Sequence, residues 1–233
     1  MFKAVVALAV GTVVGYLLFP YVLDILIAPY CDLPEGMRTQ ERCTLVALRP
    51  LEPFSVRIRT ALVIGLFIAG PVMFTQLWRF ITPGLTRRER SFALPFVVLS
   101  QVMFGFGILF AYLVIPRALA ILLGLGGPLV EPMLSASEYL KFFLAMCVAF
   151  GLVFELPLVL ISLAFTGVVT ANGLRRARPY SVVAMMVASA IITPTTDAVT
   201  LLLVAGPMWL FYELSIGVAW YLDRRRTRRG RRR

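Results

Sequence analysis

The sequence predicts an all-α, polytopic membrane protein with six transmembrane helices. The chain of 233 residues is 60% hydrophobic and only 15% charged, which leaves too little polar surface for a soluble domain. Long uncharged runs recur along it, and they are continuous rather than alternating. Because backbone groups in hydrocarbon must be paired, only helices or a closed barrel fit, and continuous runs favour helices. Residues 1–222 are expected to form one six-span domain and residues 223–233 a basic cytoplasmic tail.

The first three spans are expected at residues 4–23, 60–78 and 92–115. Pro116 is expected to end the third span. Inside that span, Gly105 and Gly107 are typical of helices that approach one another closely. Residues 24–53 carry five acids and three arginines and are expected to form a long outer loop.

The last three spans are expected at residues 139–166, 180–193 and 198–222, with a basic inner loop before the fifth. The fifth is short: at 1.5 Å per residue it is about 21 Å long, whereas the hydrocarbon core is about 30 Å thick. Glu213 interrupts the sixth and leaves a similarly short apolar stretch. Two short neighbouring spans imply a locally thinned bilayer or a cover of partner helices.

Basic residues set the expected orientation. If the N-terminus is cytoplasmic, 16 of the 23 Lys and Arg residues lie inside and 7 outside. Eight of them fall in residues 224–233, beside a span, so anionic lipid rather than nucleic acid is their expected partner. We therefore expect a multi-pass protein of the cytoplasmic membrane with both termini in the cytoplasm.

A short basic loop between spans two and three holds a single carboxylate, Glu89. Four arginines surround it: Arg79, Arg87, Arg88 and Arg90. Two interpretations stay open. Glu89 attracts a cationic guest, or it caps the next helix, since Thr86-x-x-Glu89 before an apolar run is a capping-box pattern.

Three further acids lie in or beside spans. Glu155, two residues before Pro157, is in the middle of span four, where an acid is costly and needs a polar partner. It is either a functional group or a neutral acid that bonds a neighbouring helix. Asp197 lies at the turn between the short spans, as a helix cap or a partner contact. Glu213 is expected to pair with an arginine of the inner loops rather than to act in transport.

The sequence contains no catalytic or metal-binding constellation. There is no histidine, and the three cysteines match no metal-ligand spacing. No enzyme activity, metal or cofactor is therefore expected. Cys31 and Cys43 both lie in the outer loop, where oxidation is permitted, and are expected to form a disulfide, while Cys147 in span four stays reduced.

Ordered motifs between residues 54 and 216 resemble the TatC family, the polytopic subunit of the twin-arginine protein translocase. In chain order they are Q-L-W-R-F-I-T-P-G-L-T-R-R-E from Gln76, F-G-F-G-I-L-F-A-Y from Phe104, F-E-L-P from Phe154, L-R-R-A-R-P-Y from Leu174, I-T-P-T-T-D from Ile192 and P-M-W-L-F-Y-E from Pro207. Each motif alone is loose, but their order and spacing together are specific.

The resemblance implies a glove-like bundle of six helices that binds twin-arginine signal peptides and exports folded proteins with the proton motive force. The implied signal-peptide site is Phe80, Pro83, Glu89 and Arg90, with Glu155 and Pro157 as the intramembrane polar site. TatA and TatB, subunits with a single span, are implied at Thr193, Pro194 and Asp197, with Glu213 nearby. A homo-oligomer within a receptor complex is implied as well.

The chain departs from the family pattern at two places. Members usually begin with a cytoplasmic arm that carries a second acid, whereas three residues precede the first span here, so either the start lies upstream or this half of the recognition site is missing. Leu201 stands where members often have a glutamine. The alternative functions are a proton-coupled secondary transporter using Glu155 and a structural assembly factor.

Overall fold

The computed structural model describes residues 2–31, 45–81, 93–124, 135–192 and 198–230. These residues form six helices: α1 (Phe2–Cys31), α2 (Glu52–Ile81), α3 (Ala93–Gly124), α4 (Ala136–Thr166), α5 (Ala171–Ile192) and α6 (Ala198–Gly230). The predicted all-α fold with six helices is confirmed.

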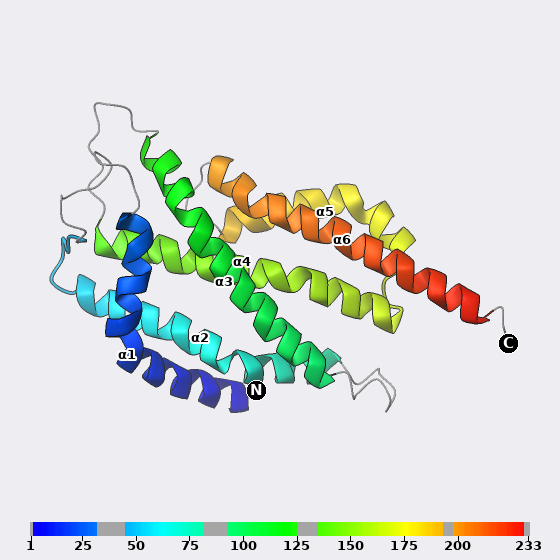
Figure 1. Ribbon diagram of the computed structural model, residues 1–233, viewed down its shortest axis with the longest axis horizontal. Helices are drawn as coiled ribbons and strands as arrows, with labels where there is room; N and C mark the ends of the chain where they lie inside the picture. Colours follow the sequence, from blue (N-terminus) through cyan, green and yellow to red (C-terminus); the bar gives the residue numbers. More distant parts are fainter. Residues whose placement is uncertain (1, 32–44, 82–92, 125–134, 193–197, 231–233) are drawn as a thin grey trace.

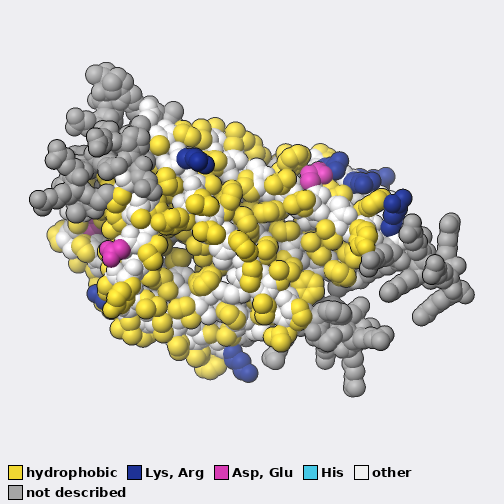
Figure 2. Space-filling model, viewed as in Figure 1, with side chains coloured by type: hydrophobic (Ala, Val, Ile, Leu, Met, Phe, Trp, Pro, Cys, Tyr) yellow, Lys and Arg dark blue, Asp and Glu magenta, His cyan; other side chains and the backbone are white. Residues whose placement is uncertain are grey.

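Five of the six helices are long and apolar enough to cross a membrane, and α5 is the exception. Its first two turns carry Arg175, Arg176 and Arg178, so its apolar part is too short to span a bilayer alone. Figure 2 shows a face covered largely by hydrophobic side chains, with few charged side chains, several of them gathered toward the right-hand end.

The helices alternate in direction, and α4 is the central one (Figure 1). It packs against α2, α3, α5 and α6, while α1 lies along α2 and α5 along α6. α5 ends and α6 begins at the same end of their pair. In Figure 1 this end does not extend as far along the bundle as the first residues of α2 and α4. The α5–α6 pair is thus displaced along the bundle axis toward the end that carries the C-terminus.

Several predicted boundaries are wrong, and in each case the helix continues. Pro116 lies inside α3, which extends to Gly124. Proline within a membrane helix costs one backbone hydrogen bond and is tolerated where neighbouring helices compensate. The predicted basic inner loop before the fifth span belongs to α5 itself. The sixth helix is not short, since α6 runs through Glu213 for 33 residues and includes residues 223–230 of the basic tail.

The first helix shows what a proline does in this bundle. Pro20 lies inside α1, and Figure 1 shows that this helix is bent along its length, as an internal proline favours. Two glycines, Gly11 and Gly15, are buried against α2, where an added Cβ would meet the backbone oxygens of Gly65 and Ala61 at 2.7 and 2.6 Å. Close approach through small residues therefore holds α1 on α2.

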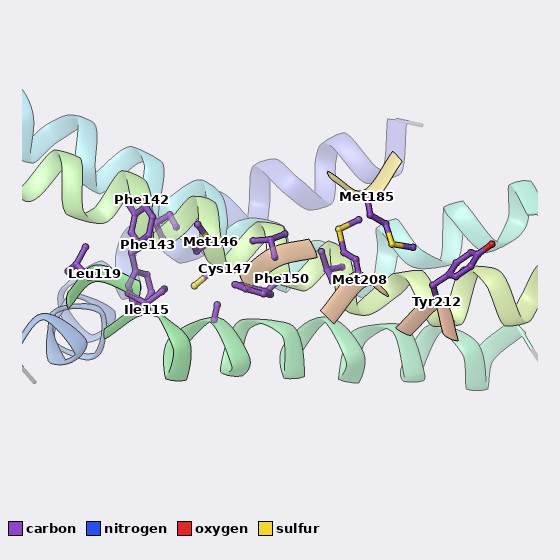
Figure 3. Close-up of a cluster of buried hydrophobic side chains, with 14 of the residues drawn as sticks. Ile115, Leu119, Phe142, Phe143, Met146, Cys147, Phe150, Met185, Met208 and Tyr212 are labelled. Atoms are coloured by element: carbon purple, nitrogen blue, oxygen red, sulfur yellow. The ribbon is translucent and has the colours of Figure 1, made fainter. Parts of the chain in front are cut away.

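The core is a row of aromatic and aliphatic side chains on α4 that faces α3 and α6 (Figure 3). Phe143 and Phe150 are each 1% exposed. Gly107 of α3 is in contact with the Phe150 backbone, so its predicted role in close packing is confirmed. Gly105 differs, because a Cβ there would lie 3.7 Å from the Phe67 ring, which is ordinary contact.

Candidate functional site

Most of the predicted site residues lie outside the described part of the chain. This applies to Pro83, Glu89 and Arg90 of the signal-peptide site and to Thr193, Pro194 and Asp197 of the partner site. Phe80 belongs to the last turn of α2, but its side chain is not described. The structure therefore places the helix ends around both sites, Ile81 and Ala93 for the first and Ile192 and Ala198 for the second.

Glu155 is a buried acid in the middle of a membrane-spanning helix. It lies on α4 and is 9% exposed. The Ser100 hydroxyl of α3 donates a hydrogen bond to its carboxyl group. Its second oxygen, Oε1, is buried and has no hydrogen-bond partner among the described residues. One of the two acceptor atoms is thus free to receive a donor from a guest molecule.

A glutamine on α3 extends the polar character of this region toward α2. Gln101 follows Ser100 directly and donates from Nε2 to the backbone oxygen of Phe67 at 3.1 Å. Its Oε1 is buried without a partner and touches Gly70, where any side chain would collide with it. Two buried acceptor oxygens, one on Glu155 and one on Gln101, therefore lack donors.

Aromatic packing holds the Glu155 segment in place. Phe154 packs between Phe110 of α3 and Phe211 of α6, with ring centroids 5.6 and 4.7 Å away. Pro157 follows within α4, so its nitrogen donates no backbone hydrogen bond at this level. The acid is thus fixed on a rigid helix between α3 and α6.

Where α5 begins, polar contacts fasten it to α6. Arg178 of α5 forms an ion pair with Glu213 of α6, which confirms the expected pairing with an arginine. The Ala171 backbone N–H donates to the Asp223 carboxylate at 3.0 Å and so uses a free donor of the α5 N-terminus. The Tyr212 hydroxyl donates to the Leu174 carbonyl at 2.7 Å. Glu213 therefore has a structural partner within the chain.

Glu52, the first residue of α2, joins α2 to the start of α4. Its Oε2 accepts from the backbone N–H groups of Leu48 and Arg49, and its Oε1 from that of Ser137 at 2.7 Å. Ser135 caps α4 by accepting from the Glu138 N–H at 3.2 Å. Glu52 precedes the apolar part of α2, and the Ser137 N–H, then the Ser135 hydroxyl, lower its pKa to about 2.

The two cysteines in the described residues have the predicted oxidation states. Cys31, the last residue of α1, is disulfide-bonded, and Cys147 is a buried free thiol. Cys43 lies outside the described residues, so its pairing with Cys31 stays a prediction.

Sequence reasoning missed three of these polar residues: Ser100, Gln101 and Glu52. Ser100 and Gln101 are two adjacent polar residues in an otherwise apolar stretch of α3. This polar pair is the feature of the sequence that could have indicated a site. Glu52 was counted as part of a polar loop, although an acid directly before Pro53 is typical of a helix start.

Comparisons with known proteins agree on one family. The model of the TatC family, described as Sec-independent protein translocase protein, matches residues 1–207. The TatC protein of Koribacter versatilis is 43% identical over 80% of this chain and 69% of its own length. That of Aquifex aeolicus is 38% identical over 91% of this chain and 87% of its own. That of Frankia casuarinae is 39% identical over 97% of this chain, which spans 64% of the relative's length.

A solved structure extends the agreement to the fold. The crystal structure of the twin-arginine translocase receptor TatC in DDM superposes with a TM-score of 0.80 at 38% identity. The match covers 93% of this chain and 94% of the other. On the family match, the sequence identities and the shared six-helix fold, the chain belongs to the TatC family of Sec-independent protein translocase proteins.

Proposed function

We propose that this protein is the receptor and scaffold subunit of a twin-arginine translocase. It binds the twin-arginine signal peptides of folded precursor proteins at its cytoplasmic end, and the proton motive force drives their export. The observation that carries the proposal is the likeness, over 93% of this chain, to a structure described as a twin-arginine translocase receptor.

The loop between α2 and α3 is the proposed recognition site for the signal peptide. Glu89 is its acid, with Phe80, Pro83 and Arg90 beside it in sequence. A carboxylate can accept two parallel hydrogen bonds from one guanidinium group, which suits a guest that carries paired arginines. The neighbouring arginines oppose general attraction of cations, so only a closely fitted guanidinium gains from the contact.

The buried acceptors on Glu155 and Gln101 are the proposed site for a polar group of the inserted signal peptide. Both oxygens lack donors and both lie inside the bundle, where an unmet acceptor is costly. A backbone or side-chain N–H of the guest that reached either oxygen would remove that cost. This supports a site for an inserted segment in addition to the cytoplasmic loop.

The outer end of the α5–α6 pair is the proposed docking region for the TatA and TatB subunits. Val187 and Ile191 of α5 and Leu202 of α6 are 54%, 79% and 59% exposed there. Thr193, Pro194 and Asp197 lie between these residues in sequence. A single-span helix laid on this surface would bury apolar area and cover helices that stop short of the outer end.

Replacement of one residue tests the proposed recognition site. In Glu89→Gln the capping role can persist, because an amide oxygen still accepts a backbone N–H, but the charge is lost. We expect the variant to insert normally while crosslinking of a twin-arginine precursor falls about tenfold or more, the scale of a lost charge-assisted contact. Glu89→Asp should fall between the two. Normal crosslinking by Glu89→Gln would reduce Glu89 to a helix cap.

Co-purification tests the proposed class of protein. A translocase subunit should bring down single-span helical partners and precursors with their signal peptides. If the purified chain instead moved a small solute across liposomes without any partner, the alternative of a proton-coupled transporter would replace the proposal.

A further inference from the structure

An apolar groove runs between α2 and α4 on the surface of the bundle. Its cavity is about 450 Å³, and its walls include Leu62 and Val63 of α2 and Val148 and Leu152 of α4. The two helices pack against each other, and the groove, lined by residues of both, is a seam between them. Among the described residues, none from α5 or α6 lines it.

Two cationic side chains stand at one end of this groove. Arg59 of α2 and Lys141 of α4 both line it and are both exposed. Among the described residues neither forms an ion pair with an acid; the ion pair found there joins Arg178 to Glu213. Within the described part of the chain, both cations are therefore left without a carboxylate partner.

The acids near Arg59 and Lys141 do not form ion pairs with them. Glu52 and Glu138 line the adjoining outer cavity together with Arg59. Both oxygens of Glu52 already accept backbone N–H groups. Glu138 is one helical turn from Lys141 but lies beyond ion-pair distance of it in the structure. The charge balance at the mouth of the groove is thus positive among the described residues.

The length of the groove fits one leaflet of a membrane. From Lys141 to Leu152 the α4 helix rises about 16 Å at 1.5 Å per residue. Half of the hydrocarbon core is about 15 Å thick. A chain that starts at the level of Lys141 therefore reaches the bilayer midplane near Leu152.

We infer that this groove binds one anionic phospholipid. Its phosphate lies between Arg59 and Lys141, and one acyl chain follows the seam to Leu152. The charge distribution predicts that these helix ends face outward, so the lipid belongs to the outer leaflet. Basic sites between transmembrane helices suit anionic headgroups. A partner helix suits the seam less well, because a helix is about 10 Å wide and α2 and α4 already touch.

Native mass spectrometry of the purified full chain in detergent tests this inference. The probes are phosphatidylglycerol and phosphatidylcholine with identical acyl chains. We expect one retained copy of phosphatidylglycerol and clearly weaker retention of phosphatidylcholine. Arg59→Gln and Lys141→Gln should each weaken phosphatidylglycerol binding about 5-fold, and the double variant roughly 30-fold. Arg117→Gln, at the same end of α3 but outside the groove, should change nothing.

A second variant tests the apolar part of the site. Val148→Trp fills the seam and leaves both cations in place, so it should also lose phosphatidylglycerol binding; Ala145→Leu serves the same purpose if Val148→Trp does not fold. Thermal unfolding in lipid-free detergent checks that each variant is folded. Equal retention by the double cation variant, or equal binding of the two lipids, would overturn the inference. So would a photo-crosslinker at Val148 that captures a protein rather than a lipid in native membranes.

Discussion

At the level of single residues, Glu155 has a carboxyl group that is only half satisfied. One side bonds Ser100, and Oε1 has no partner within the described structure. We expect Glu155→Gln to keep most export activity, because its amide nitrogen can donate to the Ser100 oxygen while its amide oxygen still accepts from a guest N–H. Glu155→Ala should lose about tenfold more, since it removes both carboxyl oxygens, the one that bonds Ser100 and the one offered to a guest. Export of a twin-arginine reporter in cells measures both variants.

The comparison of Gln with Ala separates two roles for this residue. Protein level in the membrane is the control for insertion. If Glu155→Gln were as inactive as Glu155→Ala, the residue would act through its charge or by proton transfer, and the hydrogen-bond account would fail.

Glu52 gives a prediction about pH. Its pKa is lowered to about 2 in the folded protein, so the ionised carboxylate stabilises the fold fully above its usual value of 4.5. That contribution is lost as the pH falls from 4.5 toward 2. We therefore expect Glu52→Gln to lower the thermal midpoint at pH 7, with a difference from wild type that shrinks by pH 3.

The matched control for this measurement is Glu138→Gln. Glu138 lines the same outer cavity, but the backbone N–H groups of Leu48, Arg49 and Ser137 donate to Glu52 and not to it. Its replacement should leave the midpoint nearly unchanged. A difference between Glu52→Gln and wild type that stayed constant down to pH 3 would contradict the assignment.

At the level of elements, the two glycines of α3 give a matched pair of substitutions. Gly107→Ala forces a Cβ into the Phe150 backbone of α4, and overpacking of this kind costs about 1–3 kcal/mol. Gly105→Ala meets only ordinary contact and gains up to about 1 kcal/mol of helix propensity. Thermal unfolding in detergent should thus show a lower midpoint for the first and an equal or higher one for the second. Equal midpoints would show that α3 and α4 shift apart at little cost.

Helix existence was predictable from the sequence, whereas helix ends were not. Continuous apolar runs set the number and order of the helices, because hydrocarbon leaves few alternatives for the backbone. The ends depended on tertiary contacts. α5 begins before its apolar part because Asp223 and Tyr212 of α6 satisfy its first turns. Glu213 does not end α6, because Arg178 neutralises it.

The candidate site was predictable in part. Glu155 could be identified from the sequence, because an acid in the middle of an apolar run is unusual. Its partner could not, because Ser100 is 55 residues away in sequence and reaches Glu155 only through α3–α4 packing. For the same reason, Gln101 could not be identified as a site residue from the sequence. The loop residues were identified by motif, which depends on family resemblance rather than on any contact.

At the level of the whole molecule, the charge distribution predicts that both termini are cytoplasmic. Leu48, between α1 and α2, should then face outward, and Arg176, near the start of α5, should face inward. Both positions are exposed, Leu48 by 63%. A membrane-impermeant maleimide added to intact cells should label a cysteine at position 48 but not one at position 176. Labelling at position 176 before the cells are broken would reverse the topology.

The Glu52 contact also orders the biogenesis of the protein. Glu52 and Ser137 are 85 residues apart in sequence, so at about 5–20 residues per second the acid is synthesised about 4 to 17 s before its partner. During that interval α2 must already hold its acid on the far side of the membrane. The bond then forms only if the start of α4 arrives on the same side. If α4 were inserted in the opposite direction, the Glu52 carboxylate would lack the Ser137 N–H. The contact therefore favours correct insertion of α4 while the chain is being inserted.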